Sequence, residues 1–202
     1  MKFNRKSITG LALAGVLCFG VAGTLAWLKD ETVTVQNTFT TSGIDIDLNE
    51  TDAVLNDSTS QKEKFFKMIP GFTISKDPKV TVKANSETCY VFVEVIESNS
   101  LNTYISYTVD STWTKLELSD NSKKVYYRTV TSSTSDETFS VLTGDTVTVK
   151  DSVTDEQMKA LSAPGAVQPT LSFKAYAIQK ANGNQTEFKP EEAWNTIKDM
   201  AG

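Results

Sequence analysis

Histidine is absent from this sequence of 202 residues. Its absence excludes histidine general bases, Ser-His-Asp and Cys-His nucleophile systems, HExxH zinc sites and haem ligation through histidine. Cysteine occurs only at Cys18 and Cys89. Two cysteines are too few for a multi-bridge disulfide scaffold or a Cys₄ zinc site. These absences disfavour a conventional enzyme, and we expect neither a bound metal nor another cofactor.

Positive charge is also in short supply, with 20 Lys+Arg against 25 Asp+Glu and a net charge of −5. A nucleic-acid partner requires a basic footprint, so the balance argues against one. Threonine, serine and valine are abundant, and together they make up about a third of the chain. Because threonine and valine favour strands, the composition predicts a β-rich globular protein.

The N-terminus has the pattern of a secretory signal peptide. Residues 1–6 contain three basic side chains and no acid, and residues 7–28 carry no charge. The small residues of Thr24-Leu25-Ala26 predict cleavage between Ala26 and Trp27. The apolar stretch is also long enough to span a bilayer, so a retained anchor is the alternative. Leu17, directly before Cys18, argues against a lipoprotein signal, which requires a small residue there.

Cleavage leaves residues 27–202, interpreted as one domain. The removed segment holds three basic residues and no acidic ones, so the net charge changes from −5 to −8. Cys89 is then the only cysteine, and its place in an apolar strand favours a buried structural thiol over a reactive one.

Alternation of apolar and polar side chains predicts about ten short strands in the body of the chain. The expected ranges are 32–40, 44–48, 65–69, 79–83, 89–96, 103–109, 113–118, 124–130, 139–142, 146–149 and 170–178. Residues 89–96 are apolar on both faces and should form a central strand. Residues 49–63 are polar and rich in turn formers, which predicts a loop.

Two short helices are expected, at 154–161 and 190–200. Thr154 and Gln157 form a capping-box pattern at the first, and Pro190 occupies the first position of the second. Short antiparallel strands with frequent turns and no βαβ rhythm predict an all-β antiparallel β-sandwich, jelly-roll-like, with these two helices.

Motifs for metal binding or acid–base chemistry are weak in the part of the chain that follows the predicted signal peptide. Asp45 and Asp47 begin like a calcium loop, but Glu50 stands where an EF-hand requires glycine and Asn56 where it requires glutamate. A solvated strand face is therefore the preferred interpretation. Glu94 is the only acid within the most apolar strand, and we expect it to face outward.

Strand aromatics could line a sugar-binding face, although such residues more often pack in the core. The candidates are Tyr90, Tyr104, Tyr107, Trp113, Tyr126 and Tyr127.

The segment directly after the predicted cleavage site is more informative. Residues 27–41 alternate Val33, Val35 and Phe39 with polar residues and contain no proline or glycine. A strand at the start of a mature protein can pair within its own chain or with the open sheet edge of a neighbour. Val33, Val35 and Phe39 are the candidate self-assembly residues.

Short motifs follow the predicted cleavage site: Ala26, Trp27, Asp30, residues 37–40 (NTFT) and residues 43–48 (GIDIDL). In these motifs the chain resembles the TasA/camelysin family of secreted Gram-positive proteins, which are processed by a SipW-type signal peptidase. Ile46 stands where the family has an acid or lysine. Residues 68–95, AYAIQ at 175–179 and EEAW at 191–194 are similar to the clostridial branch.

This resemblance implies a jelly-roll fold and a surface or biofilm-matrix protein. It also implies head-to-tail fibres, in which the mature N-terminal strand completes the sheet of the next subunit. Partners would be further copies of the chain, a signal peptidase during export and an accessory matrix protein. Camelysins have been called metalloproteases, but without histidine that activity is not carried over.

The sequence therefore favours a secreted, non-enzymatic structural protein that assembles by strand donation. The alternatives are a monomeric surface module that binds cell-wall glycan and, less favoured, a secreted hydrolase using carboxylates and a metal, such as a camelysin-like protease.

Overall fold

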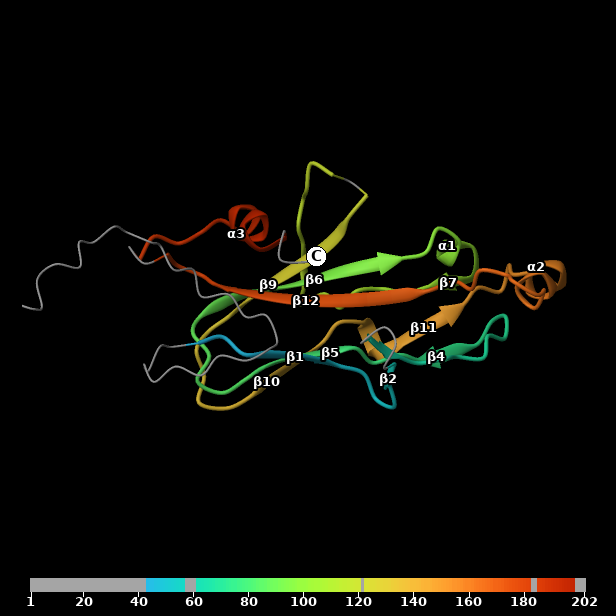
Figure 1. The fold of residues 1–202 in the computed structure, drawn as a ribbon, viewed down its shortest axis with the longest axis horizontal. Helices are drawn as coiled ribbons and strands as arrows, with labels where there is room; N and C mark the ends of the chain where they lie inside the picture. Colours follow the sequence, from blue (N-terminus) through green and yellow to red (C-terminus); the bar gives the residue numbers. More distant parts are fainter. Residues whose placement is uncertain (1–42, 57–60, 121, 183–184, 199–202) are drawn as a thin grey trace, which may run out of the picture.

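The computed structural model describes residues 43–56, 61–120, 122–182 and 185–198. These residues form two layers of antiparallel strands (Figure 1). The upper layer is a four-stranded sheet, in spatial order β12 (Leu171–Gln179), β6 (Cys89–Glu97), β9 (Lys124–Val130) and β8 (Thr114–Lys115). The expected all-β antiparallel sandwich is confirmed, and β6 is central in its sheet as predicted.

The lower layer contains two three-stranded sheets. One has the order β1 (Ile46–Asn49), β5 (Lys79–Val82) and β10 (Glu137–Ser140), and the other β4 (Thr73–Ser75), β11 (Thr146–Val149) and β7 (Ile105–Ser106). The chain passes from one sheet to the other at residues 76–78, between β4 and β5, and again at residues 141–145, between β10 and β11. Bonds from Val141 N–H to Pro78 O and from Lys76 N–H to Asp145 O, both 2.9 Å, pair these two connections with each other. A separate hairpin pairs β2 (Val54–Asn56) with β3 (Gln61–Glu63).

The helices are α1 (Leu101–Tyr104), α2 (Asp155–Leu161) and α3 (Pro190–Ile197), with a 3₁₀ turn at Thr143–Asp145. The described residues thus contain three α-helices where two were expected, because α1 occupies part of the range predicted as a strand at 103–109. The capping box of Thr154 and Gln157 and the opening proline of α3 are confirmed.

The core follows from the alternation in β6. Its odd-numbered residues, including Val91 and Val93, face the lower layer and pack with Val80 and Val82 of β5. Its even-numbered Phe92 faces the other way and packs under α3, which covers the outer face of the upper sheet. A further cluster, around Leu142 and Val149, fills the end of the sandwich that carries α1 and α2.

Two other predictions were wrong. Residues 65–69 are not a strand, and Phe65 in that range is 91% exposed. Residues 49–63, expected as a loop, contain the β2–β3 hairpin. No helix within the described ranges is long and apolar enough to cross a membrane.

Candidate strand-addition site

Strand β12 is the longest edge strand that the structure describes. It pairs with β6 in one continuous antiparallel register from Leu171 opposite Glu97 to Gln179 opposite Cys89. Within the described part of the chain, no strand pairs with its other side. A nine-residue edge is long enough to accept a further strand.

Hydrogen bonds to β6 alternate along β12, and this alternation shows which peptide groups of β12 point away from β6, towards the open side of the strand. Ser98 N–H donates to Thr170 O before the strand, and Lys180 N–H donates to Thr88 O after it, both at 3.0 Å. Bonded and non-bonded pairs alternate in an antiparallel ladder, so the even-numbered residues bond to β6. The odd-numbered residues direct their N–H and C=O groups outward: Leu171, Phe173, Ala175, Ala177 and Gln179.

On the same side of the sandwich, a set of apolar side chains from β12 and β1 is only partly buried, and this set is called the apolar lining. Leu171, Phe173 and Ala175 of β12 pack against the core cluster but are only partly buried. Ile46 and Leu48 of β1 are in the same state, and β1 contacts β12 across the sandwich. Since β1 is also an edge strand among the described residues, an added strand would cover apolar surface from both layers.

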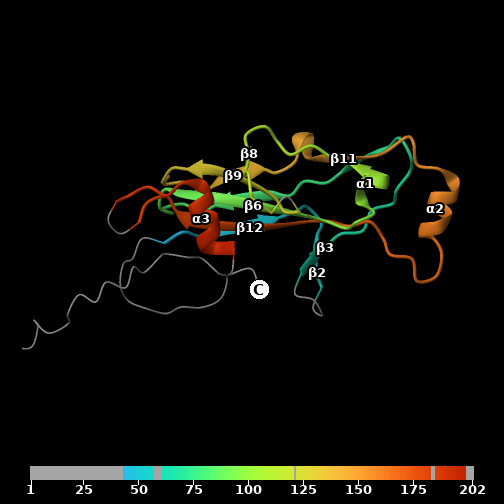
Figure 2. The ribbon, with the colours of Figure 1, turned by 90° about the horizontal axis from the view of Figure 1, so that it is seen from above.

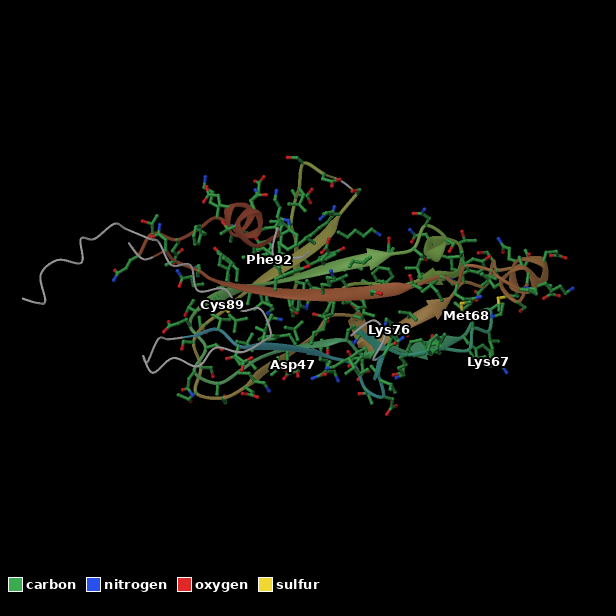
Figure 3. All side chains as sticks on the ribbon, in the orientation of Figure 1. Asp47, Lys67, Met68, Lys76, Cys89 and Phe92 are labelled. Carbon is green, nitrogen blue, oxygen red and sulfur yellow. The ribbon has the colours of Figure 1, made fainter. Side chains whose placement is uncertain are left out.

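A charged pair lies at one end of this lining. Lys76 Nζ is 2.8 Å from Glu50 Oε2, and the two side chains are only 11% and 13% exposed. The ammonium group also lies over the rings of Phe66 and Phe173, at 5.6 and 5.5 Å from their centres. These contacts offset part of the desolvation cost of the pair. Figure 3 shows Lys76 between the two layers.

The residues predicted for assembly and processing, Ala26, Trp27, Val33, Val35 and Phe39, lie outside the described residues. The structure therefore supplies the edge to which a strand could be added, and the sequence supplies the candidate strand. Sequence reasoning missed the β12 edge. Its one signal is Lys174 in the middle of an apolar strand, since lysine is a common device for protecting an edge from unwanted pairing.

The acidic residues considered for metal binding do not gather. Asp45 is exposed, and Asp47 contacts Asn49 and lies 3.8 Å from Lys62 Nζ. No group of three or more cysteine or acidic side chains in the described ranges could hold a metal ion. Glu94 lies on the outer face of its sheet, where it accepts a hydrogen bond from Tyr176 Oη at 3.2 Å.

The strand aromatics do not form one exposed face. Tyr90, Tyr104 and Trp113 are buried. Tyr127 packs in the cluster beneath α3, whereas Tyr126 packs against the core between the layers. These residues therefore belong to the core, the interpretation preferred from the sequence, and they give no support to a sugar-binding strip.

Cys89 is fully buried between the two layers. Burial, with a smaller contribution from the negative charge of Glu137, raises the pKa of its thiol to about 12. The thiolate, which is the reactive form of cysteine, is therefore suppressed at neutral pH. The expectation of an unreactive structural cysteine is confirmed.

One partly buried carboxylate, that of Glu97, has a lowered pKa and is expected to contribute to acid sensitivity. Burial acts to raise the pKa of Glu97, but hydrogen bonds from Lys124 Nζ (2.7 Å) and Tyr107 Oη, with the lysine charge, lower it overall. The unfolded chain therefore takes up this proton at a higher pH than the folded one. The stabilisation is present above the ordinary pKa of 4.5 and is lost as the pH falls below it.

We expect Glu97→Gln to lower the free energy of unfolding at pH 7 by about 1.5–3 kcal/mol, because it removes a charge-assisted pair. The difference from the unmodified protein should shrink towards pH 3, and urea unfolding at several pH values measures it. Glu117→Gln, at an exposed side chain, is the matched control and should have little effect. A difference that does not change with pH would contradict this role of Glu97.

Comparison with known proteins returned no matching family model, curated protein or solved structure.

Proposed function

We propose that this chain is a secreted, non-enzymatic structural protein of the cell surface or biofilm matrix, which assembles into fibres by strand addition. The observation that carries the proposal is the open side of the sandwich, where the outward peptide groups of β12 lie beside partly buried apolar residues. Residues 27–41 of a second copy are the proposed donor strand.

The donor and the acceptor match in chemistry and spacing. Val33, Val35 and Phe39 fall on one face of an extended strand, as do Leu171, Phe173 and Ala175 of the acceptor. Alternate residues in both strands are about 6.6–6.8 Å apart, so donor side chains can fill successive positions along the opening. Backbone hydrogen bonds would supply affinity, and the apolar side chains would fix the register.

The geometry of such a contact favours open assembly. The donor leaves one surface of a subunit and the acceptor edge is a different surface, so the contact is heterologous and gives filaments unless the rotation closes a ring. The charge of the processed chain, −8, keeps unassembled copies soluble.

The proposed location rests on residues 1–26, which have the pattern of a signal peptide, and on the resemblance to the TasA/camelysin family. A SipW-type peptidase would cut between Ala26 and Trp27, and an accessory matrix protein could start fibre growth. Strand assembly is favoured over the monomeric glycan-binding alternative because the strand aromatics pack in or against the hydrophobic clusters instead of forming one exposed strip.

Deleting residues 27–41 from the secreted chain tests this proposal. We expect a folded protein that stays monomeric at concentrations where the parent forms filaments, because the donor is lost and the sandwich is not. Light scattering and negative-stain microscopy measure assembly, and circular dichroism checks the fold.

A matched pair of variants tests the side chains of the donor. Val33, Val35 and Phe39 changed together to threonine should not assemble. Thr32, Thr34 and Thr38 changed together to serine should assemble normally, because they lie on the opposite face. Filaments from the deletion, or equal behaviour of the two triple variants, would refute strand donation. A monomer that binds insoluble cell-wall polysaccharide would instead support the alternative.

A further inference from the structure

One buried carboxylate oxygen beside the apolar lining has no hydrogen-bond partner among the described residues. It is Oε1 of Glu50, whose other oxygen, Oε2, lies 2.8 Å from Lys76 Nζ. Taking a carboxylate oxygen out of water without giving it a donor costs free energy. The unpaired oxygen therefore indicates that a donor from outside the described residues completes this site.

Glu50 continues the inward face of β1. Ile46 and Leu48 pack against the core between the layers, and Glu50 is two residues further on. Its partner Lys76 lies 5.5 Å from the ring centre of Phe173 on β12, which places the Glu50 carboxylate near that strand. Figure 2 shows β12 at the border of the upper sheet. The unpaired oxygen thus lies at the opening where the donor strand is proposed to add.

The ion pair limits the kind of group that can complete the site. Lys76 already balances the charge of Glu50, and both side chains are almost buried. A further cation would leave an unbalanced charge there, and a further acid would repel Glu50. A neutral N–H or O–H donor fits, and a side-chain amide carries two N–H groups.

The proposed donor strand has one such group on its apolar face. In an extended strand, side chains two residues apart point to the same face, which here presents Val33, Val35, Asn37 and Phe39. Asn37 is the only polar residue of the four. Its amide would cost free energy between the layers unless it found an acceptor. The amide of Asn37 and Oε1 of Glu50 therefore supply what the other lacks.

The order of these side chains selects one direction for the added strand. In the donor and on the inward face of β1, two apolar residues precede a polar one at two-residue spacing. Val33, Val35 and Asn37 correspond in this way to Ile46, Leu48 and Glu50. A donor parallel to β1 brings all three pairs together, because both strands advance about 6.6–6.8 Å per two residues. The reverse direction would leave both valines beyond the lining.

The same direction suits the open edge of β12, because β1 and β12 run in opposite directions. The chain enters β1 at Gly43, whose C=O accepts from Glu87 N–H just before the start of β6, and that start pairs with Gln179 at the end of β12. It leaves β1 at Glu50, near Phe173 in the first half of β12. A donor parallel to β1 is therefore antiparallel to β12, as β6 already is.

We propose that Asn37 of the donor strand donates a side-chain hydrogen bond to Glu50 Oε1 of the acceptor subunit, and that this contact sets the register of strand addition. The inference rests on the proposed function, because it concerns the same donor and acceptor. A slipped register would leave both polar groups unpaired in an apolar contact, and a single buried polar residue specifies register in this way in other assemblies.

Asn37→Leu in the full secreted chain separates a hydrogen bond from simple burial of apolar surface. We expect the critical concentration for filament growth, measured by sedimentation, to rise about tenfold, because Glu50 Oε1 would be enclosed without a donor. If the contact were only apolar, leucine would lower the critical concentration. The matched control is Gln36→Leu, on the opposite face of the donor, which should assemble like the parent. An Asn37→Leu critical concentration at or below the parental value would overturn the proposal.

Cross-linking measures the register directly. With Asn37 opposite Phe173, Gln36 lies opposite Lys174, which is exposed on the outer face. Lys174 would form a non-hydrogen-bonded pair with the donor, and the Cα atoms of such a pair, about 4.5 Å apart, are within disulfide range. Gln36→Cys and Lys174→Cys proteins, mixed and oxidised, should therefore give linked dimers. Equal or stronger linkage of Lys174→Cys to Thr34→Cys, a register shifted by two residues, would overturn the proposal.

The triple donor variant separates failure of this inference from failure of strand donation. If the change of Val33, Val35 and Phe39 to threonine leaves assembly intact, strand donation fails, and the Asn37 contact fails with it. If the triple variant does not assemble but Asn37→Leu assembles as well as the parent, strand donation stands and the Asn37 contact alone fails.

Discussion

Ala175→Pro is expected to abolish filament growth while leaving the sandwich folded. Ala175 lies in the middle of β12 and belongs to the residues whose N–H points away from β6. Proline removes that N–H and places its ring on the open side, so it blocks an incoming strand without breaking a bond to β6. Edge strands tolerate proline at such positions. Light scattering at rising protein concentration measures the loss, and thermal unfolding checks stability.

Two controls define what the Ala175→Pro result means. Lys174→Pro removes an N–H that bonds to β6, so this variant should be markedly destabilised. Ala175→Thr keeps the backbone N–H and should still form filaments. If Ala175→Pro assembled at the parental concentration, the β12 edge would not be the acceptor, and the short β1 edge would be the remaining candidate beside the same apolar lining.

Strands could be predicted from the sequence where the local pattern of apolar and polar residues matches the burial of the side chains in the structure. The ranges 124–130 and 146–149 form strands with the predicted bounds. The second alternates throughout as TVTV, and the first is rich in valine, tyrosine and threonine, which favour strands. The apolar run in β6 gave its central position correctly, since each face of that strand is covered, one by β5 and the other by α3.

The secondary-structure predictions were wrong where the local sequence pattern differs from the way the side chains pack in the structure. Phe65 and Phe66 lie in an apolar run that suggested a strand, but Phe65 faces solvent and Phe66 contacts Lys64 and Lys76. The hairpin within 49–63 was missed because its strands are only three residues long and lie among polar residues. Residues 101–104 form a helical turn because Leu101 and Tyr104 pack into the core at that end of the sandwich.

Of the two parts of the candidate site, the sequence predicts the donor segment but not the acceptor edge. The donor segment is recognisable because it is local and alternating. The acceptor is defined by strand order, which depends on pairings between residues as distant as Leu171 and Glu97. No local pattern shows that β12 lies at an edge, apart from the weak signal of Lys174.

The second large expected effect concerns α3. Trp194 is 2% exposed, and its ring centre lies 5.5 Å from that of Phe92 on β6 and 5.4 Å from that of Tyr176 on β12. We expect Trp194→Ala to lower the free energy of unfolding by about 3–5 kcal/mol, because it leaves a cavity between the helix and the outer face of the sheet. Urea unfolding followed by circular dichroism measures the change, and Glu191→Ala on the exposed side of α3 is the matched control.

The Trp194 result also bears on assembly, because α3 covers the face of the upper sheet and the proposed donor pairs with its edge. Loss of the indole should therefore reduce stability without removing any group that contacts an added strand. Below the melting temperature of the variant, Trp194→Ala should still form filaments, in contrast to Ala175→Pro, which should be stable but monomeric. A loss below about 1 kcal/mol would mean that α3 is not part of the cooperative unit. Loss of filaments from a still-folded Trp194→Ala protein would indicate that the outer face takes part in assembly.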